Sequence, residues 1–258
     1  GQIVDQALVG TPGAKTGWLH LVQFDQSNPP VRRGAATTDL GPKSLDVNCR
    51  DMPARYAELE SNGYRFRAPI SEYEVGDLHA REAQMPAHDD TNVVLIEVLG
   101  WNIRLSDAGY GAVTSFVVIV PDTEVEGAFY TQLFGLDELM HHRIVGPAIE
   151  KAVGLPRGSA LLMRLMGRET ELFGRMELVQ YEGLTGTDRF PLAKAPSLGT
   201  LHCRFEVDSM DGFVERARSL GVAVRDYGPI QTMFGPGRAA AVYSPAGLRL
   251  EVIEPDVK

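Results

Sequence analysis

Two nine-residue stretches decide the fold: Ser44-Leu-Asp-Val-Asn-Cys-Arg-Asp51-Met52 and His202-Cys-Arg-Phe-Glu-Val-Asp-Ser209-Met210. Both begin as strand-like segments and lead into a segment with helical hydrophobic period. They lie 158 positions apart, and the same offset separates Gly63 from Gly221, where a glycine would end each following helix. The two stretches are therefore copies of one repeated unit.

The end of the unit recurs four times, as a short apolar strand with one polar residue at a fixed place. The copies are Trp18-Leu-His-Leu-Val-Gln23, Leu95-Ile-Glu-Val98, Arg175-Met-Glu-Leu-Val-Gln180 and Arg249-Leu-Glu-Val-Ile-Glu254. A further opening strand, 115–122, begins another copy between the two nine-residue stretches. The chain thus holds several copies of one supersecondary unit.

The unit is predicted to be βαβββ. In the first full copy Met52, Tyr56 and Leu59 share one helical face, and strands are expected near 64–69, 80–85 and 92–99. Residues 1–33 match only the last two strands of a unit, with a hairpin over 3–10 and 17–24. We therefore expect either that the natural chain has residues before Gly1 or that the missing strands are supplied otherwise.

The predicted fold class is α+β, with tandem βαβββ modules that pair into cupped, barrel-like mixed sheets. We expect an N-terminal domain over 1–108, whose first module is incomplete, and a C-terminal domain over 109–258. Glycine and proline runs mark the connectors between modules.

The composition is that of an ordinary globular protein: 258 residues, 44% hydrophobic, 23% charged and a net charge of −9. No apolar run reaches the ~18 residues of a membrane span, and the negative charge disfavours nucleic acid as a partner. Cys49 and Cys203 are predicted to be buried thiols rather than a disulfide. A cytoplasmic location is the expectation.

Two phrases and the repeat itself resemble the vicinal oxygen chelate superfamily, which includes glyoxalase I, bleomycin-resistance proteins and extradiol dioxygenases. The phrases are Ala128-Phe-Tyr-Thr-Gln-Leu-Phe-Gly-Leu136 and Tyr243-Ser-Pro-Ala-Gly-Leu-Arg-Leu-Glu251. The resemblance implies a divalent metal ion held inside a cupped sheet by residues from the first and fourth strands of paired modules.

Carried over to this chain, that pattern selects Ser115 and Glu177 from one module and His202 and Glu251 from the next. His202, Glu251 and Glu177 are competent ligands for Fe, Mn, Zn or Mg, and Glu177 could double as a catalytic base. Ser115 departs from the pattern, because a hydroxyl is a poor ligand, so it is expected to contact ligand instead. The alternative is a metal-free cavity in which the carboxylates bond to the hydroxyl and the imidazole.

The N-terminal half offers His20 and Glu97, with Ser44, as a second metal site. The alternative is a degenerate structural copy in which His20 is solvated or internally paired.

Three further residues are candidates with structural alternatives. His141 is a candidate catalytic acid or base, although the pair His141-His142 also fits an exposed strand. Met163 is a candidate for an apolar cavity wall, or simply core. Tyr243 is a candidate binding residue, but its spacing from Pro245 differs from that of the extradiol tyrosine, which argues against catechol ring cleavage.

Two functions follow from the resemblance. One is a metal-dependent lyase, isomerase or dioxygenase-like enzyme, in which the ion chelates vicinal oxygens of a small organic substrate. The other is a metal-free binding protein of the bleomycin-resistance type for an aromatic or amphipathic molecule. A homodimer is a further expectation for either.

Overall fold

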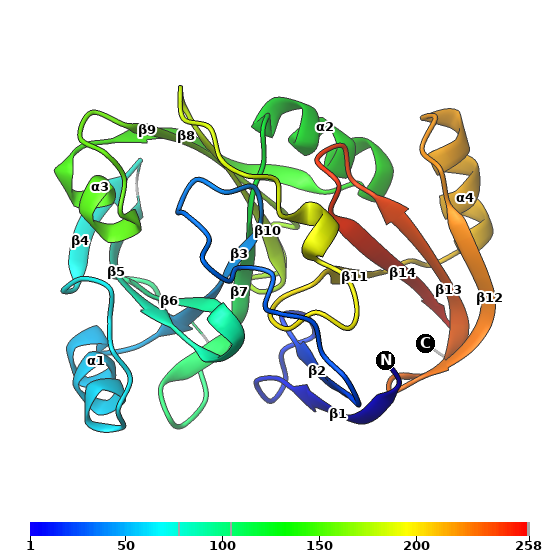
Figure 1. The fold of residues 1–258 in the computed structure, drawn as a ribbon, viewed down its shortest axis with the longest axis horizontal. Helices are drawn as coiled ribbons and strands as arrows, with labels where there is room; N and C mark the ends of the chain where they lie inside the picture. Colours follow the sequence, from blue (N-terminus) through cyan, green and yellow to red (C-terminus); the bar gives the residue numbers. More distant parts are fainter. Residues whose placement is uncertain (77, 104, 257–258) are drawn as a thin grey trace.

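The computed structural model describes residues 1–76, 78–103 and 105–256. Within this part of the chain the strands form sheets of eight, four and two strands. The eight-stranded sheet and the four-stranded sheet lie side by side, and the two-stranded hairpin lies near the gap between them (Figure 1). We call these the central sheet, the terminal sheet and the N-terminal hairpin.

The central sheet is mixed, with the strand order β4-β5-β6-β3-β7-β10-β9-β8. Its strands are β3 (Gly41–Cys49), β4 (Ser71–Val75), β5 (Leu78–Pro86), β6 (Asn92–Val98), β7 (Tyr110–Ile119), β8 (Asp137–Val145), β9 (Ala160–Gly167) and β10 (Arg175–Tyr181). Each opening strand pairs in parallel with the last strand of its own module, β3 with β6 and β7 with β10. The two opening strands pair antiparallel with each other. One sheet therefore unites the modules at 41–98 and 110–181.

The helix that follows each opening strand begins at a side-chain cap. The helices are α1 (Met52–Ser61), α2 (Thr123–Phe134) and α4 (Met210–Ser219), with α3 (Pro147–Val153) as an insertion and short 3-10 turns at His88–Asp90 and Phe190–Leu192. Asp51, Asp122 and Ser209 each accept a backbone N–H of the first turn. These capping residues occupy the same place in each module, so the repeat extends to the helix start.

The central sheet curls strongly enough to bring its two edges together. Gly76, directly after β4, lies where an added Cβ would be 3.2 Å from Cε1 of His142 on the opposite edge strand β8. Helix α3 packs on β4, β5 and β8, with Ile149, Ala152 and Val153 buried. The hydroxyl of Thr37 donates to the carbonyl of Val153 at 2.8 Å. Helix α3 thus packs on both edge strands of the sheet, and the loop around Thr37 is bonded to its last residue.

The terminal sheet carries the last module, in the order β11-β14-β13-β12. Its strands are β11 (Cys203–Glu206), β12 (Arg225–Thr232), β13 (Gly235–Tyr243) and β14 (Arg249–Pro255). Leu250 and Val252 share one buried cluster with Phe213 of α4 and Leu133 of α2. The carboxylate of Glu126 on α2 accepts the backbone N–H of Ala246 at 3.0 Å. Helices α2 and α4 therefore join the two sheets through one core.

The N-terminal hairpin is formed by β1 (Ile3–Val9) and β2 (Leu19–Phe24), which pair antiparallel as predicted. Its attachment to the central sheet passes through Gly17. The carbonyl of Gly17 accepts the N–H of Val113 at 3.1 Å, and the hydroxyl of Thr16 donates to the carbonyl of Phe173 at 2.7 Å. This contact fixes the start of β2 against the central sheet.

The α+β class with a curled mixed sheet is confirmed. The module at 110–181 shares this sheet with the module at 41–98 rather than with the last module, its expected partner. The predicted boundary between 108 and 109 falls inside the central sheet, because β3 pairs with β7. The segment 64–69, predicted as a strand, precedes β4 as a loop. There Phe66 stacks on Tyr56 of α1 with ring centroids 4.0 Å apart, so the apolar alternation serves loop-to-helix packing.

In the described part of the chain, no helix is both long and apolar enough to cross a membrane.

We predict that Gly17→Ala lowers the free energy of unfolding by about 2 kcal/mol or more. Gly17 has φ +74°, and an added Cβ would lie 2.3 Å from the carbonyl oxygen of Val113. Gly34→Ala is the matched control, because Gly34 has φ +65° with nothing within 4 Å. Gly34→Ala should lower the free energy of unfolding by only about 1 kcal/mol, the cost of placing alanine at a positive φ. Urea unfolding measures both, and equal losses would contradict the hairpin attachment.

Candidate functional site

Polar side chains of the strands gather in two separate places. The central cluster, on the central sheet, consists of Asp46, Ser115 and Glu177. The terminal cluster consists of His202, Arg204, Arg249 and Glu251 on the terminal sheet, with His20 of the hairpin in electrostatic range.

The central cluster is created by the pairing of β3 with β7, which sets Asp46 directly opposite Ser115. The Ser115 hydroxyl donates to Oδ2 of Asp46 at 2.6 Å and lies 3.4 Å from Oε2 of Glu177. Burial, followed by the charge of Glu177, raises the pKa of Asp46 well above its ordinary value. Burial also raises the pKa of Glu177, whose carboxyl group interacts with that of Asp46. The burial and closeness of the two carboxyl groups thus favour one proton held between them.

More buried polar groups surround this pair and bond to one another. The Tyr73 hydroxyl donates to Glu82 at 2.7 Å, and the ammonium of Lys43 donates to the Tyr181 hydroxyl at 2.5 Å. Burial, then the charge of Arg32, lowers the pKa of Lys43 to about 7. Most of these groups find their partners within the protein, so the cluster is an interior hydrogen-bond network. Oδ1 of Asp46 is the exception, since it is buried and has no hydrogen-bond partner among the described residues.

The terminal cluster is centred on the carboxylate of Glu251. Arg249 donates to its Oε1 at 2.8 Å, Arg204 donates to its Oε2 at 3.3 Å, and Nε2 of His202 lies 3.3 Å from Oε1. Burial alone would raise the pKa of Glu251, but the hydrogen bond from His202 and then Arg249 hold it well below its ordinary value. Glu251 is therefore firmly ionised and neutralised by its neighbours.

His20 approaches this cluster from β2 of the N-terminal hairpin. Its Nε2 lies 3.0 Å from the amide oxygen of Gln6. Burial and the charge of Arg204 lower the pKa of His20, whereas Glu251 raises it and His202 lowers it further. The hairpin thus supplies an imidazole to the face of the terminal sheet that carries Glu251.

The structure does not gather the predicted metal ligands into one set. Glu177 lies with Asp46 in the central cluster, whereas His202 and Glu251 form the terminal cluster. Among the described residues, no three His, Cys, Asp or Glu side chains form a group able to hold a metal ion. The set His202, Glu251 and Glu177 was predicted from a pairing of the module at 110–181 with the last module, whereas the structure joins it to the module at 41–98.

The structure does not bring together His20 and Glu97, the residues of the predicted second site. The Glu97 carboxylate accepts the backbone N–H groups of Asp51 at 2.7 Å and Met52 at 3.2 Å, so it holds the start of α1. Gln180 does the same for α2, and Glu254 for α4. Glu97 is thus the counterpart of Gln180 and Glu254, three residues beyond the place of Glu177 and Glu251.

The remaining candidates lie apart from the central cluster's hydrogen bonds. His141 is on the edge strand β8, half exposed, with Nδ1 3.6 Å from Glu138. Met163 on β9 packs against a core cluster with Val179 and Leu161. Tyr243 ends β13, 60% exposed, directly opposite Arg249 of the terminal cluster.

Three residues of the two clusters were not predicted from the sequence, namely Asp46, Arg204 and Arg249. The alternation of side chains along a strand could have identified two of them. Asp46 lies two residues after Ser44, and Arg204 lies two residues after His202. Residues two apart on a strand share a face.

A divalent ion does not fit the terminal cluster as the donors are arranged. His20, His202 and Glu251 include the right chemical types, but both oxygens of Glu251 already accept hydrogen bonds from arginines. Two fixed positive charges at hydrogen-bond distance from the only carboxylate of the cluster repel a cation. The central cluster offers no imidazole and pairs its two carboxyl groups through a proton.

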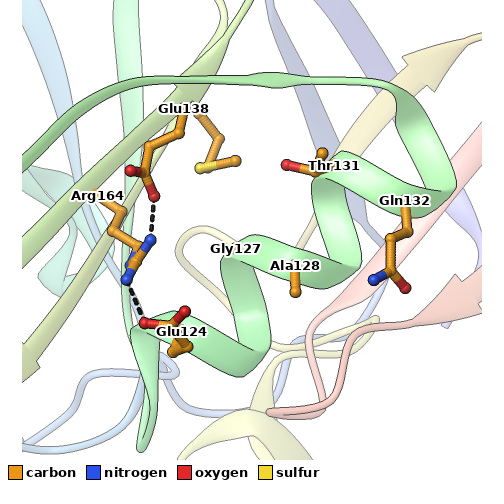
Figure 2. A pocket seen from close by; sticks show the side chains of 8 residues that line it. Glu124, Gly127, Ala128, Thr131, Gln132, Glu138 and Arg164 are labelled. Carbon is orange, nitrogen blue, oxygen red and sulfur yellow. Dashed lines mark hydrogen bonds and ion pairs between the residues drawn. The ribbon is translucent and has the colours of Figure 1, made fainter.

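A pocket of about 240 Å³ lies elsewhere, between α2 and strands β8 and β9 (Figure 2). Arg164 crosses it and donates to Glu124 at 2.5 Å and to Glu138. Gly127 permits this, because an added Cβ would lie 3.3 Å from Cδ of Arg164. The charged groups of this pocket are thus paired with one another, unlike the terminal cluster, where arginines outnumber the carboxylate.

No protein-family model and no curated protein matches the chain. Among solved structures, glyoxalase I from Zea mays aligns with a TM-score of 0.64 and 15% identity, over 96% of this chain and 78% of that one. A mutant of the same enzyme gives a TM-score of 0.65 with the same identity and coverage. A glyoxalase-family protein from Bacillus cereus aligns over 60% of this chain with a TM-score of 0.46 and 16% identity.

The protein therefore has the fold of glyoxalase I. This confirms the architecture that the resemblance to the vicinal oxygen chelate superfamily implied.

We predict that the stability of the wild-type protein falls as pH rises, in part because of Asp46. A folded pKa above the unfolded value of about 3.9 means that the folded state keeps a proton that the unfolded chain loses. Stability from this group is complete below about pH 4 and is lost as pH rises through the folded pKa. The loss is at most about 1.4 kcal/mol for each pH unit.

Asp46→Asn should flatten this dependence and be at least as stable as wild type at about pH 8. The amide can donate to Glu177 and accept from Ser115, without the proton that Asp46 must retain. Urea unfolding between about pH 5 and pH 8 measures the slope. Asp107→Asn, at an exposed position, is the control and should follow the wild type. An unchanged slope in Asp46→Asn would contradict the shared proton.

Proposed function

We propose that the protein binds a small organic molecule at the terminal cluster without a divalent ion. The observation that carries this proposal is the occupation of both Glu251 oxygens by Arg204 and Arg249. The position matches the place where the superfamily holds its ligands, on the first and last strands of a module. In this chain the position has excess positive charge, because two arginines face one carboxylate.

Accessibility favours the terminal cluster over the central one. The side chains of His202, Arg204 and Glu251 are 29%, 25% and 23% exposed. Asp46 and Ser115 are each only 2% exposed. A ligand can therefore reach the terminal cluster with little rearrangement, whereas the central network would have to open.

A second candidate is an enzyme that moves a proton on the bound molecule. The pairing of His202 with Glu251 at 3.3 Å favours it, because a carboxylate beside an imidazole orients the ring. Glyoxalase I, whose fold this chain shares, is an enzyme by name. In this candidate His202 is the acid or base, and Arg204 and Arg249 hold negative charge that develops on the substrate.

We predict that Arg204→Gln/Arg249→Gln binds Zn²⁺ at least about tenfold more tightly than the wild type. The double variant removes both charges that repel a cation and frees Glu251 and His202 as ligands. Calorimetric titration with Zn²⁺ measures both proteins. Arg143→Gln/Arg175→Gln, on the central sheet, is the charge-matched control and should behave as wild type. Tight Zn²⁺ binding by the wild type would contradict metal independence.

We also predict that a mixed library of small organic fragments finds its binding site at the terminal cluster. Nuclear magnetic resonance of the labelled protein should show that bound fragments shift the imidazole signals of His20 and His202. The signals of His79 and His88, on and next to β5, should stay unchanged and serve as controls. EDTA should leave the shifts unaltered, and fragments that bind only elsewhere would overturn the proposal.

The same experiment separates the two candidates. Conversion of a bound fragment over time, lost in His202→Gln while binding remains, would favour the enzyme. Binding without conversion by wild type favours the binding protein.

A further inference from the structure

Exposed aromatic side chains flank the terminal cluster. Tyr227, Phe234 and Tyr243, all on the terminal sheet or its β12–β13 turn, are 43%, 52% and 60% exposed. The guanidinium carbon of Arg204 lies 4.8 Å from the ring centre of Phe234, and that of Arg225 lies 5.2 Å from the ring centre of Tyr227. Arginine and aromatic groups therefore alternate over one part of the surface.

Strand register places these groups on one face. Arg225 pairs with Ala241, Ala241 with Glu251, and Glu251 with Arg204, so a single row crosses the sheet. Directly paired residues project their side chains to the same side. In a second row, Tyr243 pairs with Arg249. The core side of the sheet is the other face, where Leu250 and Val252 pack against α4.

The charge on this face is positive. Arg204, Arg225 and Arg249 oppose Glu251 in these rows, with Glu206 exposed at the end of β11. Nη1 of Arg204 is buried and has no hydrogen-bond partner among the described residues. A buried donor of this kind is costly unless something accepts its proton, and a ligand oxygen would do so.

We propose that this face binds an aromatic carboxylate. The carboxylate accepts hydrogen bonds from Arg204 and Arg249, whose planar forks suit its two oxygens. The ring lies against Phe234, which contacts Arg204, and against Tyr243, which pairs with Arg249 across the sheet. The inference rests on the proposed function, because it names the class of ligand for the same cluster.

The test compares three probes that differ in one feature each. 2-Naphthoate has the ring and the charge, 2-naphthamide has the ring without the charge, and acetate has the charge without the ring. Calorimetry should show that the naphthoate binds at least about tenfold more tightly than the amide and that acetate binds more weakly than either. Raised salt should weaken the binding of the two carboxylates and leave that of the amide unchanged.

Variants locate the binding. Arg204→Gln should weaken naphthoate about tenfold and leave the amide unchanged, whereas Phe234→Ala should weaken both. Arg204→Lys, which keeps the charge but not the fork, should recover part of the loss. Arg143→Gln is the control, because Arg143 pairs with Glu182 on the central sheet. Circular dichroism confirms that each variant is folded.

The outcomes distinguish this inference from the proposed function. Equal affinity for naphthoate and amide, or unchanged naphthoate binding in Arg204→Gln, would overturn the aromatic carboxylate while fragments could still bind the terminal cluster. If the fragments also leave His20 and His202 unperturbed, both proposals fail.

Discussion

The antiparallel pairing of β3 with β7 is the contact on which the architecture depends. Both are opening strands, and each already pairs in parallel with the last strand of its own module. Their free edges expose backbone N–H and C=O groups that must find partners, and each strand supplies the partners of the other. This seam commits the modules at 41–98 and 110–181 to one sheet. The last module is left with its own four strands and a hairpin from the opposite end of the chain.

The two clusters show how the neighbours of one position decide its chemistry. Glu177 and Glu251 occupy the same place in their modules, yet the pKa of Glu177 is raised and that of Glu251 is lowered. Glu177 meets the carboxyl of Asp46 across the seam, whereas Glu251 meets the guanidinium of Arg204 on the adjacent strand. The first becomes part of a closed interior network. The second becomes the centre of an accessible, positively charged face.

The sequence predicted the modules well because period and repeat are local properties. The strand, the helix and the closing strands of each copy follow from hydrophobic spacing, and the N-terminal hairpin follows likewise. Hydrophobic spacing could not predict which modules pair, since the free edge of β7 could pair with the opening strand of the preceding or of the following module. The position of Glu97 was misjudged because its strand, like the others, is apolar with a single carboxylate. Such a carboxylate can stand either at the position that caps the helix or three residues earlier, at the position of Glu177 and Glu251. Arg204 was overlooked because arginine is not a ligand in the pattern that was carried over.

The helix-capping groups on the closing strands have a wider consequence. Gln180 and Glu254 hold helices from one face of their strands, while Glu177 and Glu251, three residues earlier, project from the opposite face. The task of docking the helix is therefore separated in space from the task of meeting a ligand. In a repeated module, the site residues can therefore be substituted without loss of the contacts that hold the helix. The contrast between the central and terminal clusters illustrates this.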